Sequence, residues 1–257
     1  MIKQAFQHSP LFIPFIMAGH PTLEISLQAI IALIESGSDI IELGVPFSDP
    51  VADGFINQRA AEIALGQGVN LPIILALVKE VRLRGYHTPI VLFSYLNPIL
   101  AMGLDQFGLQ AKEAGVNGVL IVDLPPEAGE NLYTKLRQTL EIVLLTSPTT
   151  DPKRIELYKS FDPAFIYHIS RCGVTGIQDT LTKDLEQEVT RLRSYFPSEQ
   201  KIAVGFGIST PEQAKHVASF SDGVIVGSKL VQVLEQEGLE SFKMLIEKLR
   251  VSIKFLY

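Results

Sequence analysis

The stretch IIELGVPFSDPVADG, residues 40–54, carries the information that decides both the fold and the site. It begins as an apolar run typical of a buried strand, but Glu42 stands inside that run. A loop follows that contains Asp49, Asp53 and then Gly54. A carboxylate in a low-dielectric interior is costly unless it is paired or protonated. The stretch therefore predicts either a buried ion pair or a carboxyl group with a raised pKa.

Seven further runs of the same character occur along the chain. They are continuously apolar rather than alternating, which is expected of parallel strands covered on both faces. With the opening stretch, the expected strands are 11–19, 39–45, 89–95, 118–125, 141–148, 165–170, 201–207 and 222–228. Helical spacing fills the gaps between them. Gly37 is predicted to cap one helix, Asp151 and Pro152 to begin another, and the segment starting Ser209-Thr210-Pro211 to begin a third in the same way.

Eight strand–helix units in about 250 residues match a closed (β/α)8 barrel, the TIM barrel. No Pro/Gly/Ser-rich linker or charge run divides the chain, so one α/β domain over residues 1–257 is expected. The alternative is a doubly wound open sheet, which is disfavoured because the first strand–helix turn has no GxGxxG signature. The second crossover, residues 46–70, is enlarged by a loop and a short helix, and such loops lie on the active-site face of a barrel.

Composition and charge exclude several classes of protein. A chain of 257 residues that is 47% apolar can bury a large core. Its 28 acidic and 22 basic residues give a formal charge of -6 without a basic run, so neither nucleic acid nor an anionic membrane is expected as a partner. The single cysteine, Cys172, allows no internal disulfide. Without a targeting segment or an uninterrupted membrane span, the expected location is the cytoplasm, or the plastid stroma if an organelle encodes the chain.

Glu42 is the first candidate for chemistry. Ile40 and Gly44 share its face of the strand, so its carboxyl group is expected at the top of the barrel interior. An arginine on a neighbouring strand could pair with it, but no expected strand core contains arginine or lysine. An unpaired buried carboxyl has a raised pKa, which is the condition for a general acid/base near neutral pH.

The two loop aspartates remain open on position alone. Asp49 and Asp53 lie in a turn-rich loop, where aspartate most often closes a turn or caps a helix. Asp53 directly precedes Gly54 and a helical segment, so it could be an N-cap or a catalytic group.

Glycine-rich turns late in the chain predict a phosphate site. GFGIS (205–209) and VGS (226–228) follow the seventh and eighth expected strands and lead into helices. Backbone N–H groups at such helix starts bind anions, and barrel enzymes commonly hold phosphate there. The loop RCGVTG (171–176) could close over a ligand, with Gly173 and Gly176 as its flexible points. The alternative is that these glycines only serve helix entry.

Several chemistries are disfavoured by what the strand ends lack. No lysine stands at the carboxyl end of an expected strand, which argues against a Schiff-base enzyme, and Lys229 is better placed to support a phosphate or the surface. The histidines are scattered along the sequence, so no metal site is expected. His168, within an expected strand, is predicted to be a core or wall residue and not a base. Carboxylate acid/base work on a phosphorylated substrate, without metal or organic cofactor, remains.

The segments PFIMAGHP, ELGVPFSDPVADG, FSYLNPI, DLPPE, SRCGVTG, GFGIS and VGS, in this order, resemble the tryptophan synthase α-subunit family from about residue 10 to 235. The resemblance implies cleavage of indole-3-glycerol phosphate to indole and glyceraldehyde 3-phosphate. It places the catalytic residues at Glu42 and Asp53 and leaves Asp49 as a loop residue. It implies substrate contacts at Phe15, Tyr95 and Tyr167 for the indole end, at Thr175 in the closing loop, and at Gly176, Gly205, Phe206, Gly207, Gly227 and Ser228 for the phosphate end.

The resemblance also implies a partner. The family's partner is a pyridoxal-phosphate β subunit in an α2β2 assembly, with no cofactor in the α chain, and contacts at residues 46–53, Asn97 and Pro125. A loop with few apolar anchors is expected to be ordered by that partner. Phe55, His20 and Cys172 depart from the common family pattern without removing a catalytic group.

Three other readings stay open. A related phosphosugar isomerase or synthase would share the phosphate loops but not the pattern around Glu42. A catalytically silent binding subunit would be expected to lack Glu42 or Asp53, and both are present. A stand-alone lyase that releases free indole fits the same residues.

Overall fold

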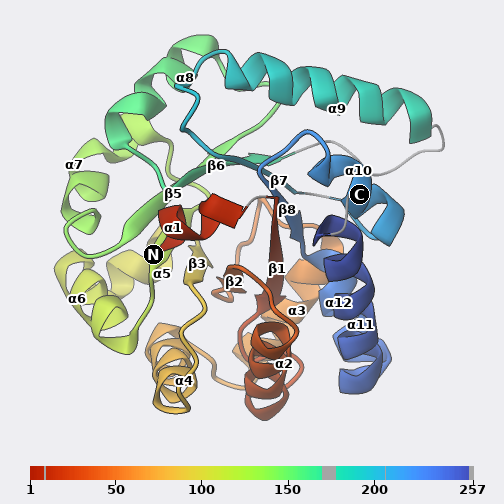
Figure 1. Cartoon of the computed structure of the whole chain (residues 1–257). Coiled ribbons are helices and arrows are strands. Elements are labelled where there is room, and N and C mark those ends of the chain that lie inside the picture. Colours follow the sequence, from red (N-terminus) through yellow and green to blue (C-terminus); the bar gives the residue numbers. More distant parts are fainter. Residues whose placement is uncertain (9, 170–177, 206, 255–257) are drawn as a thin grey trace.

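The computed structural model describes residues 1–8, 10–169, 178–205 and 207–254. Its eight parallel strands pair in chain order and close into one barrel with helices around the outside (Figure 1). The predicted (β/α)8 barrel is therefore confirmed, and the open sheet is wrong. The strands are β1 Leu11–Met17, β2 Ile41–Gly44, β3 Ile90–Ser94, β4 Gly118–Ile121, β5 Glu141–Thr146, β6 Phe165–Ile169, β7 Ile202–Gly205 and β8 Gly223–Val226.

Most strands are shorter than the apolar runs that predicted them, because those runs include loop residues beyond the strand ends. The outer helices are α2 Leu23–Glu35, α3 Phe55–Gly66, α4 Leu71–Leu83, α5 Leu96–Met102, α6 Leu104–Ala114, α7 Pro126–Leu136, α8 Pro152–Tyr158, α9 Gln178–Arg193, α10 Pro211–Ala218, α11 Ser228–Gln236 and α12 Gly238–Lys254. The short helices α1 Ile2–Ala5 and η1 Phe6–His8 precede β1, and η2 Lys159–Phe161 follows α8. The expected short helix of the second crossover is α3, which has 12 residues and is longer than predicted.

The predicted helix signals act as expected. Helix α2 ends at Glu35, Ser36 is its C-cap, and the predicted capping glycine, Gly37, follows directly with a φ of 81°. The Asp151 carboxylate accepts the backbone N–H of Lys153 at 2.7 Å at the start of α8. Thr210 begins α10 with a capping box. These local contacts satisfy backbone groups that a helix end leaves unpaired.

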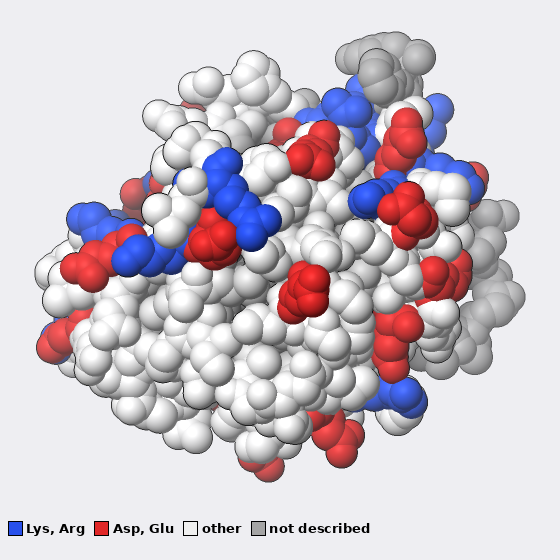
Figure 2. Space-filling view, turned by 90° about the horizontal axis from the view of Figure 1, so that it is seen from below, with Lys and Arg blue, Asp and Glu red and all other residues white. Residues whose placement is uncertain are grey.

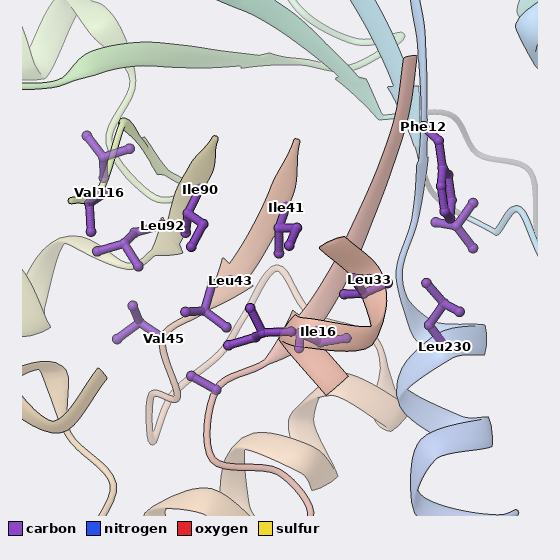
Figure 3. Packing of buried hydrophobic residues seen from close by; sticks show 14 of the residues in the cluster. Phe12, Ile16, Leu33, Ile41, Leu43, Val45, Ile90, Leu92, Val116 and Leu230 are labelled. Atoms are coloured by element: carbon purple, nitrogen blue, oxygen red, sulfur yellow. The ribbon is translucent and has the colours of Figure 1, made fainter. Parts of the chain in front are cut away.

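The core has an outer and an inner layer. Outward-facing strand residues pack against the helices, and Figure 3 shows part of this layer with Ile16, Leu43 and Leu33. Inward-facing residues such as Ile13, Val91 and Phe165 fill the barrel interior. Because both faces of every strand are covered, the strand sequences are apolar without alternation, as predicted.

Charged side chains of both signs are interspersed on the face shown in Figure 2, around a broad uncharged area. Among the described residues, no single helix is long and apolar enough to cross a membrane. The pair α3 and α4 reaches that length and composition only together, across a bend of 95°.

Candidate active site

A cavity of about 180 Å³ lies at the carboxyl ends of the strands. Side chains from β1, β3, β6 and β8 form its inner wall, and α3, α11 and the loop after β7 form its outer wall. Among its lining residues are Phe15, Asp53, Asn57, Phe93, Val122, Tyr167, Ile169, Gly207, Ser209, Gly227, Ser228 and Lys229.

Glu42 is fully buried in β2, in register with Phe15 of β1 and Val91 of β3. Neither carboxyl oxygen has a hydrogen-bond partner among the described residues, so the ion-pair alternative finds no support there. Burial alone raises the pKa of Glu42 to about 8. The side chain therefore carries its proton at neutral pH and can donate it.

Asp53 lies in the loop before α3 and is held from two sides. Its Oδ2 accepts the Tyr95 hydroxyl at 2.8 Å, and its Oδ1 faces the Asn57 amide nitrogen at 3.5 Å. Burial raises the pKa of Asp53 above its ordinary value, and these hydrogen bonds offset part of that rise. The N-cap of α3 is Gly54, and no side-chain oxygen caps this helix. The N-cap interpretation of Asp53 is therefore wrong.

The loop that carries Asp53 is better anchored than its composition indicates. The Tyr95 hydroxyl oxygen also accepts the backbone N–H of Ala52 at 3.0 Å, and the Phe47 ring packs on the Tyr95 ring with centroids 5.1 Å apart. Asp49 is exposed and accepts the Ser48 hydroxyl at 2.6 Å, so it stays outside the cavity.

Tyr167 stands close to both carboxyl groups. Burial raises its pKa first, and the charges of Glu42 and Asp53 raise it further. Its ring uses space that Gly205 leaves open, because a Cβ at Gly205 would lie 2.6 Å from the Tyr167 hydroxyl oxygen. Gly205 therefore supports the tyrosine, and it is not among the residues that line the cavity.

The inner wall of the cavity is apolar. The rings of Phe15 and Phe93 meet edge to face with centroids 5.3 Å apart, and Val122, Ile169 and Ile225 lie beside them. This wall suits a flat aromatic group more than a polar one.

The other end of the cavity suits an anion. Helix α11 begins at Ser228, directly after Gly227, and the first N–H groups of a helix have no partner within it. Lys229 lines the same cavity, and Gly207 faces it from the loop after β7 with a φ of 79°. Gly207, Gly227 and Ser228 were predicted as phosphate contacts, and the structure brings them together.

Three predicted contacts, Thr175, Gly176 and Phe206, lie outside the described residues, as does Cys172. The prediction of a core histidine is confirmed, because His168 is buried between Thr146 Oγ1 at 3.1 Å and Glu188 Oε2 at 3.3 Å. His20 is also buried, and its Nε2 lies 3.4 Å from Glu235 Oε2.

Sequence reasoning missed Asn57, which lines the cavity one helical turn after Asp53. The four-residue spacing is the signal that could have found it. Among the described residues no group of three His, Cys, Asp or Glu side chains could hold a metal ion.

The fold is a (β/α)8 barrel that holds two carboxyl groups in unlike environments near a cavity at the carboxyl ends of its strands. Comparison with known proteins gives the family. A sequence model described as tryptophan synthase alpha chain matches residues 2–254. The tryptophan synthase alpha chain of Geobacillus stearothermophilus is 46% identical over 230 residues, which are 89% of this chain and 84% of the relative. That of Dehalococcoides mccartyi is 42% identical over 98% of both chains.

Solved structures agree. The tryptophan synthase subunit alpha of Legionella pneumophila superposes with a TM-score of 0.89 at 33% identity, over 98% of this chain and 97% of that one. A chain of Mycobacterium tuberculosis tryptophan synthase superposes with a TM-score of 0.88 at 30% identity, over 99% of this chain and 98% of that one. The chain belongs to the tryptophan synthase alpha chain family. It is an enzyme of the lyase class in tryptophan biosynthesis.

The raised pKa of Glu42 makes stability depend on pH. In the unfolded chain the carboxyl has its ordinary pKa of 4.5, whereas in the folded chain it is about 8. Between these values the folded protein keeps a proton that the unfolded chain releases, so rising pH favours unfolding. Replacing Glu42 by Gln removes this contribution. The variant should therefore gain free energy of unfolding over the wild type as pH rises from 4.5 to about 8, by at most about 1.4 kcal/mol per pH unit.

Urea unfolding of both proteins across this pH range is the measurement. A difference between variant and wild type that is the same at every pH would mean that Glu42 is not protonated in the folded protein. Asp49→Asn, at an exposed loop position, is the matched control and should show no such slope.

Proposed function

We propose that Glu42 and Asp53 are the residues with which this chain cleaves indole-3-glycerol phosphate to indole and glyceraldehyde 3-phosphate, the α reaction of tryptophan synthase. One observation carries the assignment. Two carboxyl groups lie close to Tyr167, and they differ in their surroundings. Glu42 has no described hydrogen-bond donor, whereas Asp53 has two donors that offset part of the rise in pKa caused by burial. Such a pair supplies one substrate with a proton donor and a charged hydrogen-bond acceptor.

The reaction needs a proton at C3 of the indole ring and loss of a proton from the adjacent carbinol hydroxyl. Glu42 delivers the first proton. Protonated at C3, the ring carries positive charge on its N–H, which donates a hydrogen bond to the Asp53 carboxylate. When the hydroxyl proton leaves, the carbon–carbon bond breaks, its electron pair returns to the ring and the carbinol becomes the aldehyde. The proton taken from the hydroxyl restores Glu42, so acid and base are regenerated.

The cavity matches this substrate at both ends. Phe15, Phe93 and Tyr167 receive the indole ring. The start of α11, with Gly227, Ser228 and Lys229, and Gly207 opposite, receives the phosphate. Thr175, Gly176 and Phe206 are proposed as further contacts on the family resemblance alone, and Gly205 acts through Tyr167.

The partner proposed from the resemblance is a pyridoxal-phosphate β subunit in an α2β2 assembly, and no cofactor is assigned to this chain itself. The surface beside Asp53 supports this proposal. Val51 is 84% exposed and Phe55 78% exposed. Pro46, Phe47 and Asn97 line a groove on the neighbouring surface. Exposed apolar side chains beside a hollow surface are typical of a protein interface.

Substitution of the two carboxyl groups tests the catalytic assignment. Glu42→Gln and Asp53→Asn should each lower indole release by a factor on the order of 10² or more, because each removes an acid/base or charge-stabilising group. Asp49→Asn is the matched control from the same loop and should retain activity in the isolated chain. Indole release from indole-3-glycerol phosphate, followed with purified proteins, is the measurement. Turnover of Glu42→Gln like that of the wild type would refute the role of Glu42.

Mixing the chain with a β subunit tests the partner assignment. We expect association, seen by light scattering, and an increase in indole production of at least about tenfold, because the partner covers the loop that holds Asp53 and excludes water from the cavity. Phe55→Ser should weaken association while leaving the activity of the isolated chain unchanged. A chain that stays unassociated and is fully active alone would be a stand-alone indole-releasing lyase.

A further inference from the structure

Asn57 occupies a place in the site that the family resemblance did not assign. It lies on α3, one turn after Asp53, and lines the cavity. Its amide nitrogen is 3.5 Å from Asp53 Oδ1. Its amide oxygen is buried and has no hydrogen-bond partner among the described residues.

The orientation of the amide follows from the charge that it faces. A carboxylate only accepts hydrogen bonds, so the amide must present its NH2 group to Asp53 and turn its oxygen away. That oxygen is then left buried and unpaired, which costs stability. An apolar side chain of similar size would avoid this cost. What the amide does provide is the contact with the carboxylate.

Asp53 needs donors because burial works against its charge. Tyr95 donates to Oδ2 and Asn57 to Oδ1, and both bonds lower the pKa that burial raises. Three further titratable groups bear on the carboxylate: Tyr167 on β6 lies close to Asp53, Glu42 on β2 lies close to Tyr167, and Lys229 lines the same cavity as Asp53. Tyr167 and Glu42 are neutral at neutral pH, so the two hydrogen bonds are the nearest described support for the charge of Asp53.

We propose that Asn57 is a positioning residue that, together with Tyr95, fixes the plane of the Asp53 carboxylate and keeps it ionised to accept the indole N–H. The 3.5 Å separation fits a site without substrate, where such bonds are often long and tighten when the substrate binds. The identity of the N–H donor rests on the proposed function. The contact between Asn57 and Asp53 does not.

The pH profile of kcat/KM for indole release is the first measurement. The acid limb of the wild-type profile reports Asp53, which must be ionised, and the basic limb reports Glu42, which must be protonated. In Asn57→Leu the acid limb should move to higher pH. On the acid side kcat/KM should fall about tenfold below that of the wild type, and this difference should shrink as pH rises. The basic limb should stay in place. In Asn57→Asp a second carboxylate should move the acid limb further.

Gln58→Leu is the matched control. Gln58 is the next residue and donates to the backbone oxygen of Asp53 at 2.7 Å, not to its carboxylate. This variant should leave the acid limb where it is in the wild type. A general disturbance of the loop would instead affect both variants alike, and that result would overturn the proposal.

Carbon-13 NMR titration of the Asp53 carboxyl, assigned with Asp53→Asn, is the second measurement and needs no substrate. Its midpoint should be higher in Asn57→Leu than in the wild type, while the melting temperature stays equal or rises. Should Asn57→Leu fail to fold, Asn57→Ala provides the same comparison. An unchanged midpoint would overturn the role of Asn57. A wild-type chain that does not cleave the substrate would overturn the proposed function. The NMR titration would still show whether Asn57 supports the ionised form of Asp53, because it needs no substrate.

Discussion

The burial of one carboxyl group is the constraint on which the rest of the site depends. Glu42 points into the interior of the barrel between Phe15 and Val91, and no described cation or hydrogen-bond donor reaches it. A neutral acid is the form that such surroundings tolerate, because the charged form would lose its hydration without compensation. The fold therefore stores a proton at a defined place, and the pKa of about 8 lets it leave near neutral pH.

The barrel gives the second carboxylate a different setting. Asp53 comes from a loop, not from a strand, and its surroundings contain donors that favour the ionised form. Tyr167 lies close to both groups and is itself neutral at neutral pH, so it adds no charge beside them. Strand interior and loop thus give two carboxyl groups unlike surroundings, one without a described hydrogen-bond donor and one with two.

The sequence predicts those features of the fold and the site that depend on residues close together in the chain. The barrel follows from continuous apolar runs, and the inward direction of Glu42 follows from the two-residue period of a strand. The environment of Asp53 does not follow, because its partner Tyr95 is 42 residues away in sequence and meets it only in the folded barrel. Local turn statistics favoured a helix cap, and tertiary contact overrode them.

Gly205 and Asn57 show the same limit. The glycine was grouped with the phosphate loops because of its neighbours in sequence, yet the structure places it against the Tyr167 ring. The asparagine carries no motif, and only its contact with Asp53 shows what it does. A residue that acts through another side chain is recognised only from its contacts in the folded protein. A residue within a strand can be predicted from the periodicity of the sequence.

The protonation state of Glu42 in the folded, ligand-free protein is the central claim, and infrared difference spectroscopy tests it directly. The spectrum of the wild type minus that of Glu42→Gln should show, at neutral pH, the carbonyl stretching band of a protonated carboxylic acid, and this band should disappear with a midpoint near pH 8. A difference spectrum that shows only carboxylate bands at neutral pH would contradict the account.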